Sequence, residues 1–129
     1  MKKYIETILR NLINSSDDGA RIKIIEDELK SNSIQYELKE ITSRLINDPF
    51  FTKNIDELGK QSIIAKIPGQ YNSTIILNTH FDTVPSSKNM QTAHLRKKII
   101  FGRGSADALG QVVVLLGLIK KLKNQENKH

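Results

Sequence analysis

The chain contains no cysteine, and this absence excludes several kinds of site. Disulfide bonds cannot stabilise the fold, and zinc sites built on thiolates cannot form. Any metal ion must therefore be held by histidine and carboxylate side chains. A cysteine nucleophile is excluded as well, and the sequence lacks the Gly-x-Ser-x-Gly motif that presents a nucleophilic serine.

Aromatic residues are few, with no tryptophan, four phenylalanines and three tyrosines. The chain is basic, with a formal net charge of +6, but its lysines and arginines are scattered rather than gathered in one stripe. The chain therefore has few aromatic side chains on which the bases of single-stranded nucleic acid could stack. A solvated, lysine-rich surface is the favoured interpretation, and salt-dependent binding of DNA or RNA is a weaker alternative.

Long hydrophobic runs are also missing. The longest apolar stretch, 112–119, is too short to span a bilayer. The N-terminal Lys2 and Lys3 precede apolar residues, but Glu6 and Arg10 interrupt the core that a signal peptide needs. These features predict a cytoplasmic protein without a membrane partner, and 129 residues suit one domain with one core.

The apolar spacing predicts an α/β pattern along the chain. Helical spacing covers 4–13 and then a stretch from a cap at Asp17 or Asp18 to about Lys30. The remaining predictions are strands at 34–41, 63–67 and 73–78, a short extended piece at 98–101 and a helix over 106–124. Residues 42–59 are read as a loop with a short helix. Because 73–78 is almost continuously apolar, it is expected to be buried on both faces of a mainly parallel sheet.

Two segments carry residues that suit a metal-assisted hydrolase. His80 and Asp82 follow the apolar run 73–78, and residues two apart on a strand point to the same face. A carboxylate beside a metal-binding histidine holds the second ring nitrogen and fixes the tautomer. Gly102 and Gly104 allow a tight corner, after which Asp107 stands at the start of a helix and could bridge two metal ions.

Each of these residues also has a structural interpretation. A lone histidine at a strand end is more often structural than a ligand, and an aspartate before a helix is usually a cap. The Gly102–Gly104 pair lacks the third glycine of a dinucleotide-binding loop. His94 in a polar loop and His129 at the last position are expected to be surface histidines.

Taken together, the two motifs resemble the co-catalytic zinc hydrolases typified by acetylornithine deacetylase. Relatives in that family are succinyl-diaminopimelate desuccinylase, aminoacylase and the glutamate-releasing carboxypeptidases. The motifs that carry the resemblance are Asn-Thr-His-Phe-Asp-Thr-Val-Pro at 78–85 and Phe-Gly-Arg-Gly-Ser-Ala-Asp-Ala-Leu-Gly at 101–110. Residues 63–69 also look like the piece that precedes the metal strand in that family, so the resemblance covers the chain from about residue 60 and, more loosely, the N-terminal helices.

The resemblance implies a role for each motif residue. His80 would bind one zinc ion, Asp107 would bridge two, and Asp82 would be the catalytic acidic residue that orients His80. The implied cofactor is Zn²⁺, two ions per site, with Co²⁺ as a substitute. The implied reaction is hydrolysis of the amide bond of a small N-acyl amino acid or peptide substrate, with a glutamate as general base. The implied fold is a three-layer, mainly parallel α/β catalytic domain of the zinc-peptidase type.

The residues to which the resemblance assigns roles make up only part of the family's catalytic site. The general base and three further metal ligands come later in the family's sequence, as does a lid or dimerisation domain. Residues 1–129 are therefore expected to be the N-terminal part of a metallohydrolase catalytic domain, truncated and inactive alone, with a homodimer expected only for a full-length form. Leu109 and Gln111 depart from a common Lys and Gly, which leaves the substrate class open. The alternative is a non-catalytic protein that binds a metal or a partner.

Overall fold

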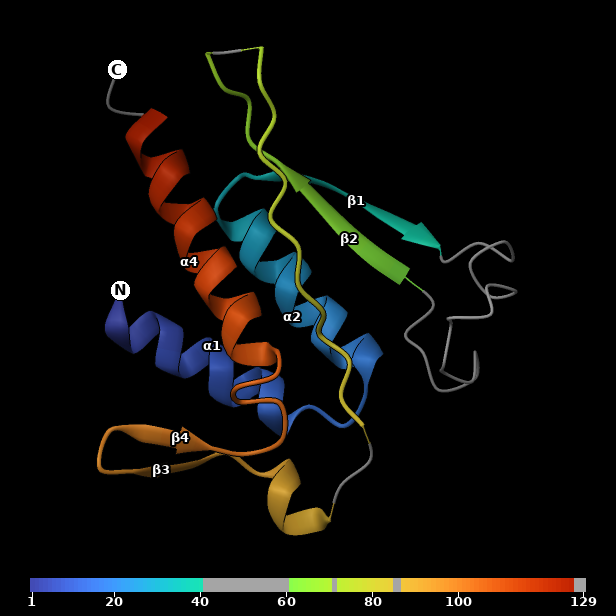
Figure 1. Cartoon of the computed structure of the whole chain (residues 1–129), viewed down its shortest axis with the longest axis vertical. Coiled ribbons are helices and arrows are strands. Elements are labelled where there is room, and N and C mark those ends of the chain that lie inside the picture. The colour runs from blue at the N-terminus through green and yellow to red at the C-terminus, as the bar shows by residue number, and fades with distance from the viewer. Residues whose placement is uncertain (41–60, 71, 85–86, 127–129) are drawn as a thin grey trace.

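Figure 1 shows the computed structural model of the chain, which describes residues 1–40, 61–70, 72–84 and 87–126. The helices within these ranges are α1 (Lys2–Asn14), α2 (Asp18–Ser31) and α4 (Leu109–Glu126), with a short 3₁₀ helix at Lys88–Gln91. The strands are β1 (Gln35–Glu40), β2 (Gln61–Lys66), β3 (His94–Arg96) and β4 (Ile99–Phe101). The predicted loop with a short helix at 42–59 lies outside the described residues.

The two N-terminal helices confirm the prediction from apolar spacing. In α1 the buried side chains recur at helical intervals: Ile8, Leu9, Leu12 and Ile13. In α2 the capping residue is Asp17, whose Oδ1 accepts a hydrogen bond of 2.8 Å from the backbone N–H of Ala20. This bond satisfies one of the donors that the first turn of a helix leaves without an internal partner.

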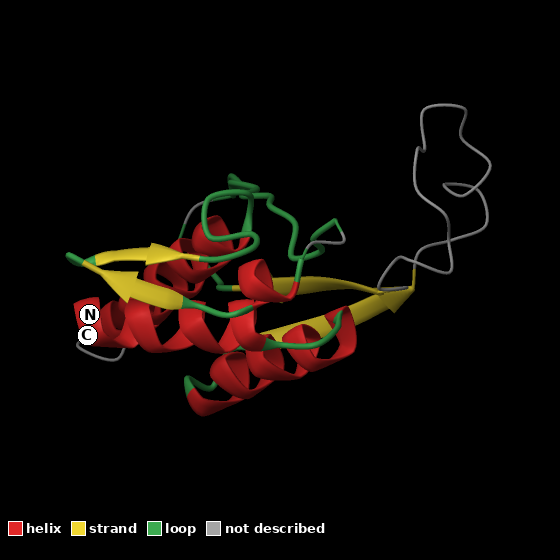
Figure 2. Cartoon of the chain, turned by 90° about the horizontal axis from the view of Figure 1, so that it is seen from below, coloured by secondary structure: helices red, strands yellow, loops and turns green. Residues whose placement is uncertain are grey.

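The core lies where the three helices meet. Figure 2 shows the helices side by side, with the β1–β2 sheet next to them. The side chains that are almost fully excluded from solvent come from all three helices: Leu12, Ile13, Leu29, Leu109 and Val113. Partly buried residues of the β1–β2 sheet, Tyr36, Ile63 and Ala65, pack against the same cluster.

Both strand pairs are antiparallel. β1 and β2 pair from Gln35 opposite Lys66 to Glu40 opposite Gln61. β3 and β4 pair from His94 opposite Phe101 to Arg96 opposite Ile99. The predicted strands near 34–41 and 63–67 and the extended piece at 98–101 are therefore confirmed as elements.

The predicted fold class is wrong. In the part of the chain that the structure describes, each sheet has two antiparallel strands, so there is no mainly parallel sheet of a three-layer α/β domain. The apolar run 73–78 forms no strand. Its side chains are exposed, with 86% of Ile75 and 84% of Ile76 accessible to solvent. An apolar run becomes a buried central strand only where strands and helices cover it on both sides, and no strand among the described residues pairs with this run.

The last helix also differs from the prediction. α4 begins at Leu109 rather than 106, after a turn that includes Ala106 and Asp107. Val112, Val113 and Leu116 are buried against the other helices, but Val114 is 59% exposed. One face of this apolar segment therefore meets solvent instead of being covered all round. None of the helices in the described ranges combines the length and the apolar character that crossing a membrane requires.

Candidate metal-binding site

His80 and Asp82 lie side by side in the segment 72–84. The ring Nδ1 of His80 is 3.0 Å from Oδ1 of Asp82 and 3.3 Å from the Asp82 carbonyl oxygen. The Asp82 side chain is 21% exposed and the His80 side chain 52%, so the carboxylate is the more sheltered partner. The expected pairing of these two residues is present although the segment is not a strand.

Asp107 approaches the opposite edge of the same imidazole. Its Oδ1 lies 3.0 Å from His80 Nε2, and the two residues are 27 positions apart in the sequence. Asp107 stands two residues before the first residue of α4, and its side chain is 85% exposed. The structure therefore brings the two motif-bearing segments together at this contact. The chemical roles of the three side chains stay predictions.

Glycine at two positions permits this approach. Gly104 has a φ of +77°, and a Cβ placed there would stand 2.8 Å from Thr83 Cγ2 and 2.9 Å from Leu109 Cδ1. A Cβ at Gly110 would collide with the carbonyl oxygen of Ser105. A larger residue at Gly104 would push the corner away from Thr83, and one at Gly110 would push Ser105 away from α4, because the nearest atoms leave no room for a side chain.

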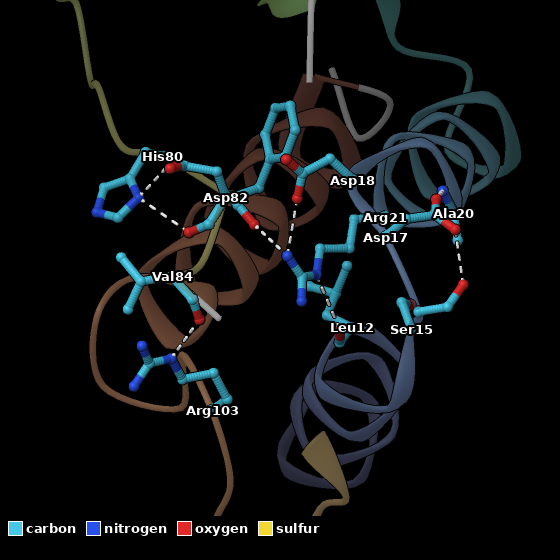
Figure 3. A network of polar contacts seen from close by, with 12 residues as sticks. Leu12, Ser15, Asp17, Asp18, Ala20, Arg21, His80, Asp82, Val84 and Arg103 are labelled. Carbon is cyan, nitrogen blue, oxygen red and sulfur yellow. Dashed lines mark hydrogen bonds and ion pairs between the residues drawn. The ribbon is translucent and has the colours of Figure 1, made fainter. Parts of the chain in front are cut away.

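Polar contacts also tie the His80 segment to its neighbours. Arg103 Nε donates a hydrogen bond of 2.9 Å to the Val84 carbonyl oxygen, which links the segment to the glycine corner (Figure 3). Thr79 Oγ1 donates to Gln111 Oε1 at 3.2 Å, which links it to the first turn of α4. Residues on both sides of His80 and Asp82 are therefore held by the part of the chain that carries Asp107.

A further contact comes from α2, and the sequence analysis missed it. Arg21 donates from one of its terminal nitrogens to the carbonyl oxygen of Phe81, at 3.3 Å. Phe81 stands between His80 and Asp82. The available signal was the position of Arg21, four residues before the buried Ile25 on the same helix, where a charged side chain is tolerated only if it is paired.

The contact between His80 and Asp107 requires a cation or a proton. If Nδ1 donates its hydrogen to Asp82, then Nε2 and Asp107 Oδ1 both present lone pairs to each other across 3.0 Å. Such a pair is favourable only with a proton or a metal ion between the two atoms. With zinc bonds of about 2.0–2.2 Å, ligand atoms this far apart subtend an angle of roughly 90° at the ion. His80 and Asp107 therefore fit as two ligands of one ion.

Asp82 cannot join them on that ion. The two ring nitrogens of an imidazole point away from each other, so Asp82 on Nδ1 and Asp107 on Nε2 lie on opposite sides of His80. Consistent with this, the described residues contain no group of three or more histidine, aspartate or glutamate side chains placed to hold one ion. A catalytic zinc ion takes three protein ligands and a water molecule. His80 and Asp107 alone would be too few for such a site.

The site opens into a hollow of about 440 Å³. One wall is formed by His80, Asp82 and Thr83, and the other by residues 102–107. This volume lies within the range of small-molecule sites. His94 lies on β3 and is exposed, as expected of a surface histidine, and His129 lies outside the described residues.

No protein-family model, no curated protein and no solved structure matches this chain. The resemblance to the co-catalytic zinc hydrolases therefore stays a prediction that rests on the two motifs.

Proposed function

We propose that this chain contributes part of the metal centre of a zinc-dependent hydrolase. The substrate class is an N-acyl amino acid or a small peptide, whose amide bond is cleaved as in acetylornithine deacetylase. The observation that carries the proposal is His80 between two carboxylates, with 3.0 Å from Nδ1 to Asp82 and 3.0 Å from Nε2 to Asp107. This is the arrangement that a metal-binding histidine with an orienting carboxylate adopts.

The residues have distinct tasks in the proposal. Asp82 accepts the Nδ1 hydrogen of His80, which leaves the Nε2 lone pair directed at the ion site and holds the ring in place. His80 Nε2 and Asp107 Oδ1 hold the ion. A bound zinc ion supplies Lewis acidity and lowers the pKa of its water to the neutral range. The hollow beside these residues leaves room for a small substrate.

The described residues are not expected to catalyse the reaction unaided. The described residues provide two ligands, and no glutamate among them stands beside His80 and Asp107 as a general base. Further ligands have to come from residues other than those described or from another chain. Incubation of the purified polypeptide with N-acetyl amino acids and Zn²⁺ or Co²⁺ is expected to release no acetate above the rate in buffer. Robust metal-dependent release would contradict this part of the proposal.

Metal binding itself is tested by calorimetric titration with Zn²⁺. His80→Gln and Asp107→Asn each remove one ligand and are expected to weaken binding by at least about tenfold. His94→Gln is the matched control, because His94 is an exposed histidine on β3, and it should bind as the wild type does. Equal affinity in the wild type and His80→Gln, or no binding in the wild type, would contradict the proposal.

A second candidate is a non-catalytic protein that binds a metal ion or a partner. It is favoured by the count of two ligands within the described residues and by the exposure of Asp107, whose side chain is 85% accessible. It predicts tight Zn²⁺ binding by a compact monomer, with no amide hydrolysis under any reconstitution. Restoration of hydrolysis by a second polypeptide that supplies histidine and acidic ligands would decide for the hydrolase.

A further inference from the structure

Arg21 is the most deeply buried charged side chain in the described ranges, with 6% of the residue exposed. Burial of a guanidinium is costly unless every N–H has a partner. The cost is offset at this position by contacts with three separate parts of the chain. Figure 3 shows Arg21 between the end of α1, the start of α2 and the His80 segment.

The three contacts form a junction. Arg21 Nη1 lies 2.8 Å from Asp18 Oδ1, one turn earlier on α2. Nε donates to the carbonyl oxygen of Leu12 near the end of α1, at 3.3 Å. The same Nη1 donates its second hydrogen to the carbonyl oxygen of Phe81, also at 3.3 Å. One planar group thus connects both N-terminal helices to the candidate site.

The Phe81 carbonyl lies between the two residues that pair in the site. A backbone rotation at Phe81 would turn Asp82 relative to His80 and would open the 3.0 Å contact between them. Three residues further along the chain, Arg103 donates to the carbonyl oxygen of Val84 from the opposite side. The loop that carries His80 and Asp82 is therefore fixed on one side by Arg21 and on the other by Arg103.

We propose that Arg21 is a positioning residue, which holds the Phe81 carbonyl so that Asp82 keeps the His80 ring turned toward Asp107. Asp18 keeps the guanidinium in place and neutralises its charge, with 15% of the Asp18 side chain exposed. The inference deepens the proposed function and rests on it for its consequence in metal binding. The orientation of the His80 ring can be measured in the metal-free protein.

The first test is the imidazole nitrogen NMR spectrum of the metal-free full chain. In the wild type His80 is expected to show one set of ring-nitrogen signals, those of an imidazole whose Nδ1 is hydrogen-bonded to Asp82, assigned by their loss in His80→Gln. In Arg21→Met these signals should move toward those of a freely exchanging histidine. The matched control is Tyr36→Phe, which removes another side-chain contact of α2, a 2.5 Å hydrogen bond to Glu26 that reaches β1 and not the site. Its His80 signals should equal those of the wild type.

Arg21→Lys provides the test if Arg21→Met does not fold. Lysine keeps the positive charge opposite Asp18. It lacks the planar guanidinium, which donates hydrogen bonds to Leu12, Asp18 and Phe81 at the same time. Its His80 signals should also be displaced. A folded Arg21→Met or Arg21→Lys protein with wild-type His80 signals would overturn the inference, as would an equal displacement in Tyr36→Phe.

A second measurement separates this inference from the proposed function. Zn²⁺ affinity is expected to fall by about tenfold in Arg21→Met, the loss typical of changes that disturb the orientation of a ligand. Unchanged affinity in Arg21→Met would count against positioning. If the wild type binds no Zn²⁺, the proposed function fails, while the metal-free ring signals still decide whether Arg21 positions His80.

Discussion

Gly104 packs directly against Thr83, so that a Cβ at position 104 would stand 2.8 Å from Thr83 Cγ2. Thr83 follows the site residue Asp82, and Gly104 precedes Asp107 by three positions. This contact therefore limits how closely the two motif-bearing segments approach. It gives the glycine corner a packing role in addition to the turn that its positive φ allows.

Gly104→Ala is expected to destabilise the protein and to separate His80 from Asp107. A φ of +77° is unfavourable for alanine, and the added methyl group meets both Thr83 and Leu109. Together these effects should lower the free energy of unfolding by about 2 kcal/mol. Urea unfolding followed by circular dichroism measures the change. Gly69→Ala is the control, because nothing lies within 4 Å of a Cβ there, and an equal loss in both variants would contradict the role assigned to Gly104.

Neighbouring valines on α4 test which face of the helix is in the core. Val113 is fully buried, whereas Val114 is 59% exposed. Val113→Ala should lower the free energy of unfolding by about 2 kcal/mol, from the lost apolar burial and the cavity left behind. Val114→Ala should change it by no more than about 0.5 kcal/mol. Similar losses in the two variants would show that α4 is covered on both faces.

Asp82→Asn is expected to weaken Zn²⁺ binding without unfolding the protein. The amide cannot offer the negative charge that strengthens the hydrogen bond to His80 Nδ1, so the ring is held less firmly. Loss of such a partner typically costs about 10–100-fold in metal affinity. Calorimetric titration measures the effect. Asp27→Asn serves as the control for loss of one exposed carboxylate on α2, and a loss there as large as that in Asp82→Asn would point to net charge instead.

The cap of α2 makes stability depend on pH. Hydrogen bonds from the Ser16 hydroxyl and from the Ala20 backbone N–H lower the pKa of Asp17 below its ordinary value of 3.8. Because the folded pKa is depressed, the stabilisation is present above the unfolded value and is lost as the pH falls through the folded one.

The Asp17→Asn variant isolates the contribution of the Asp17 carboxylate to the pH dependence of stability. Asparagine caps a helix about as well as aspartate but does not titrate in this range. The stability difference between the wild type and Asp17→Asn should therefore shrink between neutral pH and about pH 3, as judged by urea unfolding at each pH. A difference that stays constant over this interval would contradict the lowered pKa of Asp17.

The sequence by itself determined the local elements and the pairing of His80 with Asp82. Helical spacing in α1 and α2, the cap at Asp17 and the pairing of His80 with Asp82 depend on residues close together in the chain. Such short-range patterns follow from the geometry of the backbone and of neighbouring side chains. They can be read without knowing what surrounds them.

Only the tertiary structure decided the fold class and the junction at Arg21. The run Ile75–Ile76–Leu77 has the composition of a buried strand, but whether it is buried depends on which other segments cover it. The Arg21 contact joins residues 60 positions apart, and the contact between His80 and Asp107 joins residues 27 apart. Burial and long-range contacts are properties of the packed chain as a whole, so a local pattern can permit them but cannot specify them.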